Sequence, residues 1–157
     1  MALKPFKLSV IGMSACVLLM VAFMFTNLAY SESSVVDLSQ KQLINLLDKR
    51  IQDESGKVES TADLNSTQRA FILIDVRTPT EFEVGHVRTA VNIPHADILD
   101  NISLLDPYLE KDMIFYCHSG VRAGKVTRYL TELEYKGLYH LKGDFMGWQA
   151  SKLDIAQ

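Results

Sequence analysis

Two short apolar runs, each followed by a turn and a helical pattern, most constrain how this chain can fold. Residues 71–74 (FILI) and 113–116 (MIFY) contain no charged side chain. Runs of this length without alternation are typical of parallel strands that are covered on both faces. A helix start follows the first run at Thr78-Pro79-Thr80-Glu81, and a helical pattern follows the second run after Cys117. Strands that alternate with helices predict an α/β domain with a mainly parallel central sheet flanked by helices.

The other expected elements agree with this plan. Ser39 and Gln42 have the spacing of a capping box, and leucines at helical spacing follow them. The polar stretch 52–68 is expected to form a loop that is long for a compact domain. The remaining predictions are helices over 40–51, 98–109 (with a break at Pro107), 121–134 and 145–151, a short helix after Pro79, and short strands over 90–93 and 138–141.

Residues 1–31 have the pattern of an export signal. Two lysines lie within the first seven residues, residues 8–25 are almost wholly apolar, and small residues precede a predicted cleavage after Ser31. An uncleaved membrane anchor is the alternative, because the apolar stretch reaches the lower limit for spanning a bilayer, roughly 17–25 residues. In both cases residues 32–157 are expected in the periplasm, either free or anchored to the inner membrane.

Charge and cysteine content narrow the possible functions of residues 32–157. This stretch has 14 Lys and Arg against 19 Asp and Glu, a net charge of −5 that argues against a nucleic-acid partner. The chain has two cysteines, and Cys16 lies in the predicted signal, so Cys117 would have no disulfide partner. In an oxidising compartment such a cysteine is either buried and inert or retained for its reactivity.

Cys117 lies where a strand gives way to a helix, which is where active sites of open α/β sheets gather. Gly120 allows the loop to curl so that backbone N–H groups point at the sulfur, and the helix start and Arg122 add positive charge. These features would favour the thiolate at a pH below about 8.5, the usual pKa of a free cysteine. They also suit a bound anion or a persulfide sulfur. The candidate site therefore consists of Cys117 as nucleophile and of His118, Ser119, Gly120, Val121 and Arg122 as substrate-binding residues.

Four ordered sequence blocks within residues 36–152 make the chain resemble single-domain rhodaneses, a family of thiosulfate sulfurtransferase-like proteins. The blocks are Asp75-Val76-Arg77 with Glu81-Phe82, Gly85-His86-Val87 with Ala90-Val91-Asn92-Ile93-Pro94, Tyr116-Cys117-His118-Ser119-Gly120-Val121-Arg122, and Leu141-Lys142-Gly143 with Trp148.

The resemblance implies a rhodanese fold, a cysteine that carries sulfur as a persulfide, and no metal or organic cofactor. It also implies a small-molecule donor such as thiosulfate and an acceptor such as cyanide or a thiol. A non-catalytic rhodanese-like binding module is the alternative. A cysteine-dependent phosphatase is disfavoured, because four residues separate Cys117 from Arg122, whereas related phosphatases have five.

Some residues depart from the family pattern. Thr89 and Asp144 stand at turn positions where the family usually has glycine, and Ala123 replaces a frequent serine. Asp144 is expected to bring a negative charge near the site, which works against anionic thiosulfate.

Other side chains are assigned as follows. Arg77 is expected to pair with a carboxylate such as Glu81 and fix a turn, whereas Arg122 has no evident structural role and is assigned to substrate binding. His86 is interpreted as structural and Trp148 as a core residue. His95 and His140 have no partners at metal-ligand spacing, so no metal site is predicted.

Overall fold

The computed structural model describes residues 35–54 and 69–157. The predicted export signal and most of the predicted loop 52–68 lie outside these residues. Within the described ranges, no helix is both long and apolar enough to cross a bilayer.

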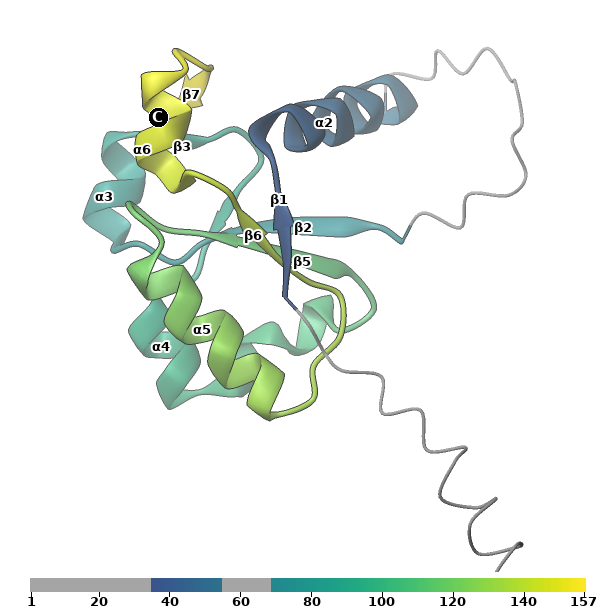
Figure 1. The fold of residues 1–157 in the computed structure, drawn as a ribbon, viewed down its shortest axis with the longest axis vertical. Coiled ribbons are helices and arrows are strands. Elements are labelled where there is room, and N and C mark those ends of the chain that lie inside the picture. Colours follow the sequence, from purple (N-terminus) through teal and green to yellow (C-terminus); the bar gives the residue numbers. More distant parts are fainter. Residues whose placement is uncertain (1–34, 55–68) are drawn as a thin grey trace, which may run out of the picture. The chain divides into compact units, whose positions relative to one another are not determined.

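A five-stranded parallel sheet forms the centre of the domain (Figure 1). Each pair of neighbouring strands is parallel, which confirms the predicted sheet type. Asp75 lies opposite Tyr116 in the register, so the carboxyl ends of two central strands meet at one edge. The strand order is β1 (Val36–Leu38), β6 (Leu138–Leu141), β5 (Asp112–Tyr116), β2 (Phe71–Asp75) and β4 (Val91–Asn92).

Helices cover both faces of this sheet, as Figure 1 shows. One face packs against α4 (His95–Asp100), the 3-10 helix η1 (Ile102–Tyr108) and α5 (Val121–Glu132). The other face packs against α2 (Gln40–Glu54) and α6 (Asp144–Ala150). The predicted α/β architecture with flanking helices is therefore confirmed.

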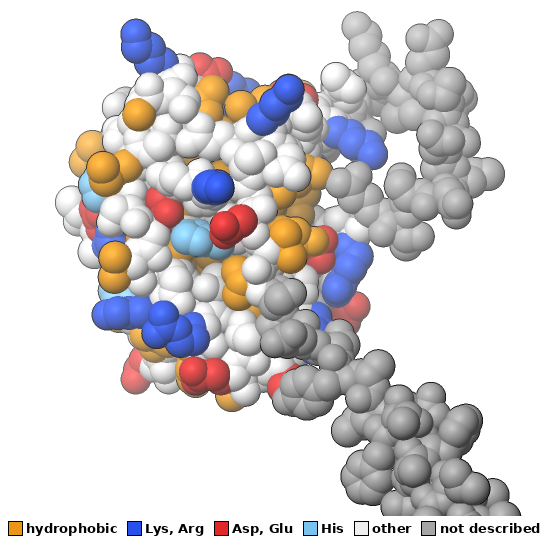
Figure 2. All heavy atoms as spheres, viewed as in Figure 1, with side chains coloured by type: hydrophobic (Ala, Val, Ile, Leu, Met, Phe, Trp, Pro, Cys, Tyr) orange, Lys and Arg blue, Asp and Glu red, His pale blue; other side chains and the backbone are white. Residues whose placement is uncertain are grey.

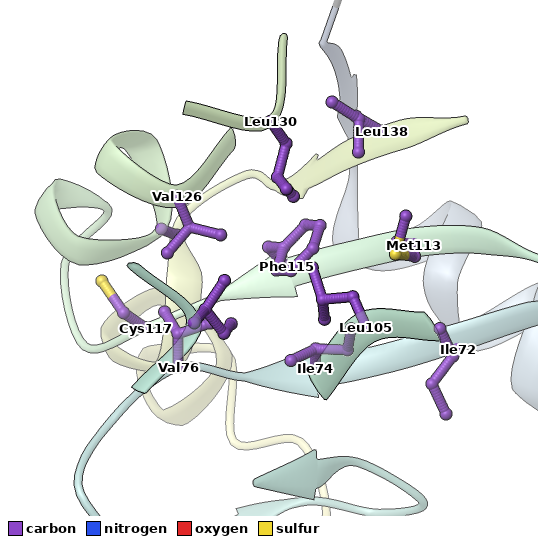
Figure 3. Packing of buried hydrophobic residues seen from close by; sticks show 12 residues of the cluster. Ile72, Ile74, Val76, Leu105, Met113, Phe115, Cys117, Val126, Leu130 and Leu138 are labelled. Carbon is purple, nitrogen blue, oxygen red and sulfur yellow. The ribbon is translucent and has the colours of Figure 1, made fainter. Parts of the chain in front are cut away.

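Strand β5 explains why the apolar runs have no polar alternation. Met113 and Phe115 pack into the cluster beneath α5, whereas Ile114 and Tyr116 pack into the cluster beneath α2 and α6. Figure 3 shows Cys117 at the end of the first cluster, with its sulfur pointing away from the other labelled side chains. The strand packs on both faces and thus fixes the position of Cys117, which directly follows its last residue.

The helix starts follow the predicted side-chain chemistry. Ser39 and Gln42 exchange hydrogen bonds at the start of α2, with the Gln42 amide oxygen 2.9 Å from the Ser39 nitrogen. Thr78 and Glu81 form the second capping box at the start of α3 (Pro79–Val84). Both boxes satisfy backbone N–H groups that a helix end leaves without partners.

Three expectations about element bounds are wrong. Helix α2 runs to Glu54, three residues past the predicted end. The helix predicted over 98–109 begins at His95 and breaks at Asn101, whose extended backbone (φ −139°) ends α4 and whose side chain caps η1. Pro107 lies inside η1 and causes no break.

The sequence patterns also missed three short strands. β1 adds to the sheet edge beside β6. The other two, β3 (His86–Val87) and β7 (Ile155–Ala156), form a separate antiparallel pair.

Candidate active site

Cys117 directly follows β5 at the carboxyl edge of the sheet, as predicted. Cys117 is only 1% exposed to solvent, and its sulfur accepts a hydrogen bond from the backbone N–H of Gly120 at 3.1 Å. Gly120 has φ +93°, a left-handed conformation that glycine adopts without strain. Helix α5 begins at the next residue, so its positive end lies behind the loop. Of the backbone N–H groups expected to point at the sulfur, that of Gly120 therefore reaches it.

Arg122 has the structural partner that the sequence did not suggest. Its two terminal nitrogens donate to the two carboxylate oxygens of Glu81 at 2.6 and 2.7 Å. This pair raises the pKa of Arg122, with the Glu81 hydrogen bond as the main cause and the nearby Cys117 as a smaller one. The same contact lowers the pKa of Glu81 to about 2. A guanidinium has five N–H donors, so Arg122 retains others for an anion beside the sulfur.

Arg77 pairs with a carboxylate as expected, but the partner is Asp75 and not Glu81. Arg77 is buried and donates to the carboxylate of Asp75 at 2.6 Å and to the carbonyl oxygen of Gly85 at 2.7 Å. Its guanidinium also lies 3.9 Å from the centre of the Phe145 ring. The physical reason is proximity, because Asp75 precedes Arg77 by two residues at the end of β2 and needs a buried counter-charge.

The predicted substrate-binding residues divide by exposure. The side chains of His118, Ser119 and Val121 are exposed, whereas Gly120 and Arg122 are partly buried beside Cys117. The loop backbone is tied to α6, because the carbonyl oxygens of Cys117 and His118 each accept an N–H from that helix at 3.0 Å. The structure therefore brings Cys117, Gly120 and Arg122 together and leaves the other three side chains at the surface.

Asp144 belongs to the site and was not among the predicted site residues. Its carboxylate is buried and accepts the backbone N–H of Cys117 at 2.8 Å. His140 lies 3.2 Å from the same carboxylate, and this contact is the main cause that raises the pKa of His140. The signal in the sequence was that Asp144 and Thr89 stand where the family usually has glycine. The structure shows why glycine is usual there, because the backbone is left-handed, with φ +53° at Asp144 and φ +69° at Thr89.

Two remaining side chains have the predicted surroundings. The ring of His86 stacks on Phe82 with centroids 3.7 Å apart, and its Nδ1 lies 3.0 Å from the Phe82 carbonyl oxygen. Trp148 is buried in the core, and its indole N–H donates to the carbonyl oxygen of Asp154 at 2.9 Å.

Comparison with known proteins identifies the family to which this chain belongs. Residues 57–151 match the model of the rhodanese-like domain, so the chain belongs to the rhodanese-like domain family. A protein of Schizosaccharomyces pombe named "Putative thiosulfate sulfurtransferase, mitochondrial" is 30% identical over 103 residues, covering 59% of this chain and 72% of the relative.

Two further similarities concern longer proteins. The tRNA uridine(34) hydroxylase of Buchnera aphidicola is 29% identical over 94 residues, which cover 56% of this chain but only 30% of that enzyme. The crystal structure of a thiosulfate sulfurtransferase from Pseudomonas aeruginosa has a TM-score of 0.58 and 17% identity, and the match covers 78% of this chain and 20% of that structure. The last similarity supports the fold alone.

Proposed function

We propose that this protein is an exported sulfurtransferase that moves a sulfane sulfur from a small donor to a thiophilic acceptor through a persulfide on Cys117. The observation that carries the proposal is the hydrogen bond from the Gly120 N–H to the Cys117 sulfur at 3.1 Å. Arg122 follows the same loop and interacts with Cys117. An N–H aimed at a sulfur, a helix start and a cation together stabilise negative charge on that sulfur.

The reaction divides into two balanced steps. In the first, the Cys117 thiolate attacks the outer sulfur of thiosulfate, the S–S bond breaks, and sulfite leaves with the electron pair. In the second, cyanide attacks the outer sulfur of the persulfide, and thiocyanate leaves while the Cys117 thiolate is restored. Both the thiolate and the persulfide are anions, so the same N–H and guanidinium groups stabilise each of them.

The loop length favours sulfur over phosphate. Four residues separate Cys117 from Arg122, and the Gly120 N–H lies within hydrogen-bond reach of the sulfur itself. A larger ring would be needed to surround a tetrahedral phosphate.

A non-catalytic binding module is the second candidate, and the burial of Cys117 favours it, because a buried free cysteine is often only a core residue.

The similarity to tRNA uridine(34) hydroxylases does not by itself support RNA as a substrate of this protein. Their similarity to this chain covers a minor part of their length. On the face of the molecule drawn in Figure 2, basic and acidic side chains are interspersed. Nucleic-acid binding instead requires basic side chains gathered on one face.

A loading and unloading experiment tests the enzymatic proposal. The protein is incubated with thiosulfate, and the peptide that contains Cys117 is analysed by mass spectrometry. We expect an added sulfur atom that cyanide removes as thiocyanate, and neither product with Cys117→Ser. A folded wild type that gains no sulfur from thiosulfate or from any persulfide donor would leave the binding module as the function.

Export is a separate part of the proposal and has its own test. The pattern in residues 1–31 supports it, with lysines before an apolar stretch and small residues before Ser31. Amino-terminal sequencing of the protein from the periplasmic fraction of a Gram-negative host should begin at Glu32. The full chain in the membrane fraction would indicate the anchored alternative, and the full chain in the cytosol would contradict export.

A further inference from the structure

The buried carboxylate of Asp144 contacts the Cys117 loop at two points. One oxygen accepts the Cys117 N–H at 2.8 Å. The other lies only 2.9 Å from where a Cβ on Gly120 would be, so it lies against the residue whose N–H reaches the sulfur. The side chain of Asp144 is 5% exposed, so little water screens its charge from the sulfur.

The protonation of His140 decides how far the charge of this carboxylate is compensated. His140, on β6, lies 3.2 and 3.3 Å from its two oxygens, and Asp37, on β1, lies 4.0 Å from the other nitrogen of His140. The main cause that raises the pKa of His140 is the hydrogen bond to Asp144, burial opposes it, and Asp37 adds a smaller attraction. With His140 neutral, the charge of the Asp144 carboxylate is uncompensated. With His140 protonated, the two side chains form an ion pair, and the charge left over is that of Asp37, whose side chain is 68% exposed.

The backbone indicates that the carboxylate itself stabilises this arrangement. Asp144 has φ +53° directly after Gly143 at φ +87°. Glycine adopts this conformation without strain, and any side chain there is at a disadvantage. The charge-assisted hydrogen bond to Cys117 offsets the strain, because bonds from N–H to an ionised acceptor are stronger than neutral ones. Asp144 is thus fixed in place behind the nucleophile.

We propose that Asp144, held by His140, is a specificity-determining residue that disfavours doubly charged sulfur donors such as thiosulfate. It favours donors with at most one negative charge, such as the persulfide of a small thiol. This inference rests on the proposed sulfur transfer. With such a donor, the Cys117 thiolate attacks the outer sulfur of R–S–SH, the S–S bond breaks, and the electron pair leaves with R–S⁻ while Cys117 keeps the S–SH group.

The charge effect can be measured without sulfur transfer. Iodoacetamide is neutral and iodoacetate carries one negative charge, yet both alkylate the same thiolate. The ratio of their rate constants at Cys117, followed by peptide mass spectrometry, cancels differences in thiolate content and access. Asp144→Asn keeps an oxygen for the Cys117 N–H and removes the charge. We expect it to raise the iodoacetate-to-iodoacetamide ratio about threefold, since repulsion between charges scales with their product.

Two further variants sharpen this measurement. Asp144→Gly fits the left-handed backbone and should raise the ratio as Asp144→Asn does, so a failure of one variant to fold leaves the other as a test. Glu132→Gln removes the same charge from the far end of α5, about 16 Å along the helix from its start, and should leave the ratio unchanged. An unchanged ratio in both Asp144 variants would overturn the proposal.

Donor kinetics then connect the charge to specificity. Because the repulsion is proportional to the charge of the donor, Asp144→Asn should raise kcat/KM about tenfold for thiosulfate and about threefold or less for a zwitterionic aminothiol persulfide. Equal gains for both donors would overturn the selectivity. If no donor loads Cys117 while the alkylation ratio changes as expected, the charge effect stands and the proposed sulfur transfer fails.

Discussion

Glu81 and Arg122 form a two-point ion pair that joins the first turn of α3 to the first turn of α5. The carboxylate of Glu81 also accepts the backbone N–H and the hydroxyl of Thr78, at 3.1 and 2.9 Å. One side chain therefore completes a helix cap and fixes the arginine beside Cys117. These contacts lower the pKa of Glu81 to about 2, and the hydrogen bond from Arg122 is the largest cause.

The lowered pKa of Glu81 predicts a loss of stability in acid. A carboxyl group with a depressed folded-state pKa stabilises the fold above its unfolded value of 4.5, and this contribution disappears as the pH falls toward 2. The Glu81 side chain is 35% exposed, so solvent screening reduces the contribution to about 1 kcal/mol. Urea unfolding at pH 7 and pH 3 should show that Glu81→Gln lacks this part of the acid sensitivity. The same acid loss in Glu81→Gln and wild type would contradict the assignment, and Glu83→Gln on the same helix serves as the control.

The shape of the Arg122 side chain is expected to matter as much as its charge. Arg122→Lys keeps the positive charge but cannot form the two parallel hydrogen bonds to Glu81. We expect kcat/KM for thiosulfate with cyanide to fall at least about tenfold, because the cation is no longer fixed beside the sulfur. Arg128→Lys, on the exposed side of the same helix, should have no effect. Full activity of Arg122→Lys would show that charge alone suffices.

The sequence predicted the parts of the fold and site that are local. The strand runs, the two capping boxes and the strand–loop–helix around Cys117 each depend on residues within about five positions of one another. It failed where long-range pairing decides, as for β1, whose three residues gain a strand conformation only beside β6. The break at Asn101 was missed because a side-chain cap competed with a helical pattern.

The same distinction applies to the charged residues. The Glu81 partner of Arg122 was missed, because the two residues are 41 positions apart and meet only when α3 and α5 are placed together. The Asp75 partner of Arg77 is two positions away, but the sequence alone does not show which nearby carboxylate is buried with it. The Asp144–Cys117 contact joins residues 27 positions apart. Only the glycine-like positions of Thr89 and Asp144 left a trace in the sequence.

The buried pair of Arg77 and Asp75 is expected to dominate stability. Both side chains are almost fully buried, and Arg77 also holds the Gly85 carbonyl oxygen. Arg77→Met leaves the carboxylate of Asp75 buried without its cation and should destabilise the fold by about 3–5 kcal/mol in urea unfolding at pH 7. In the double variant Asp75→Asn/Arg77→Met, the loss should be smaller than the sum of the two single losses. Additive losses would show that the two side chains act independently.

Two glycines at the start of α5 provide a matched test of the loop geometry. Gly124 has open space where a Cβ would lie, so Gly124→Ala should stabilise the helix by about 0.5–1 kcal/mol and leave sulfur transfer unchanged. Gly120 has φ +93°, and a Cβ there would lie 2.9 Å from the Asp144 carboxylate.

Gly120→Ala should therefore cost about 1–2 kcal/mol of stability from the backbone alone, and more from the contact with Asp144. Sulfur transfer should fall further than stability explains, because the shifted loop moves the Gly120 N–H away from the Cys117 sulfur. Adding Asp144→Gly removes the contact but not the backbone strain, so the double variant Gly120→Ala/Asp144→Gly should recover only part of the lost stability. Urea unfolding and thiocyanate formation measured on the same preparations separate the two effects. Wild-type turnover by Gly120→Ala would show that the N–H contact to the sulfur contributes nothing to the reaction.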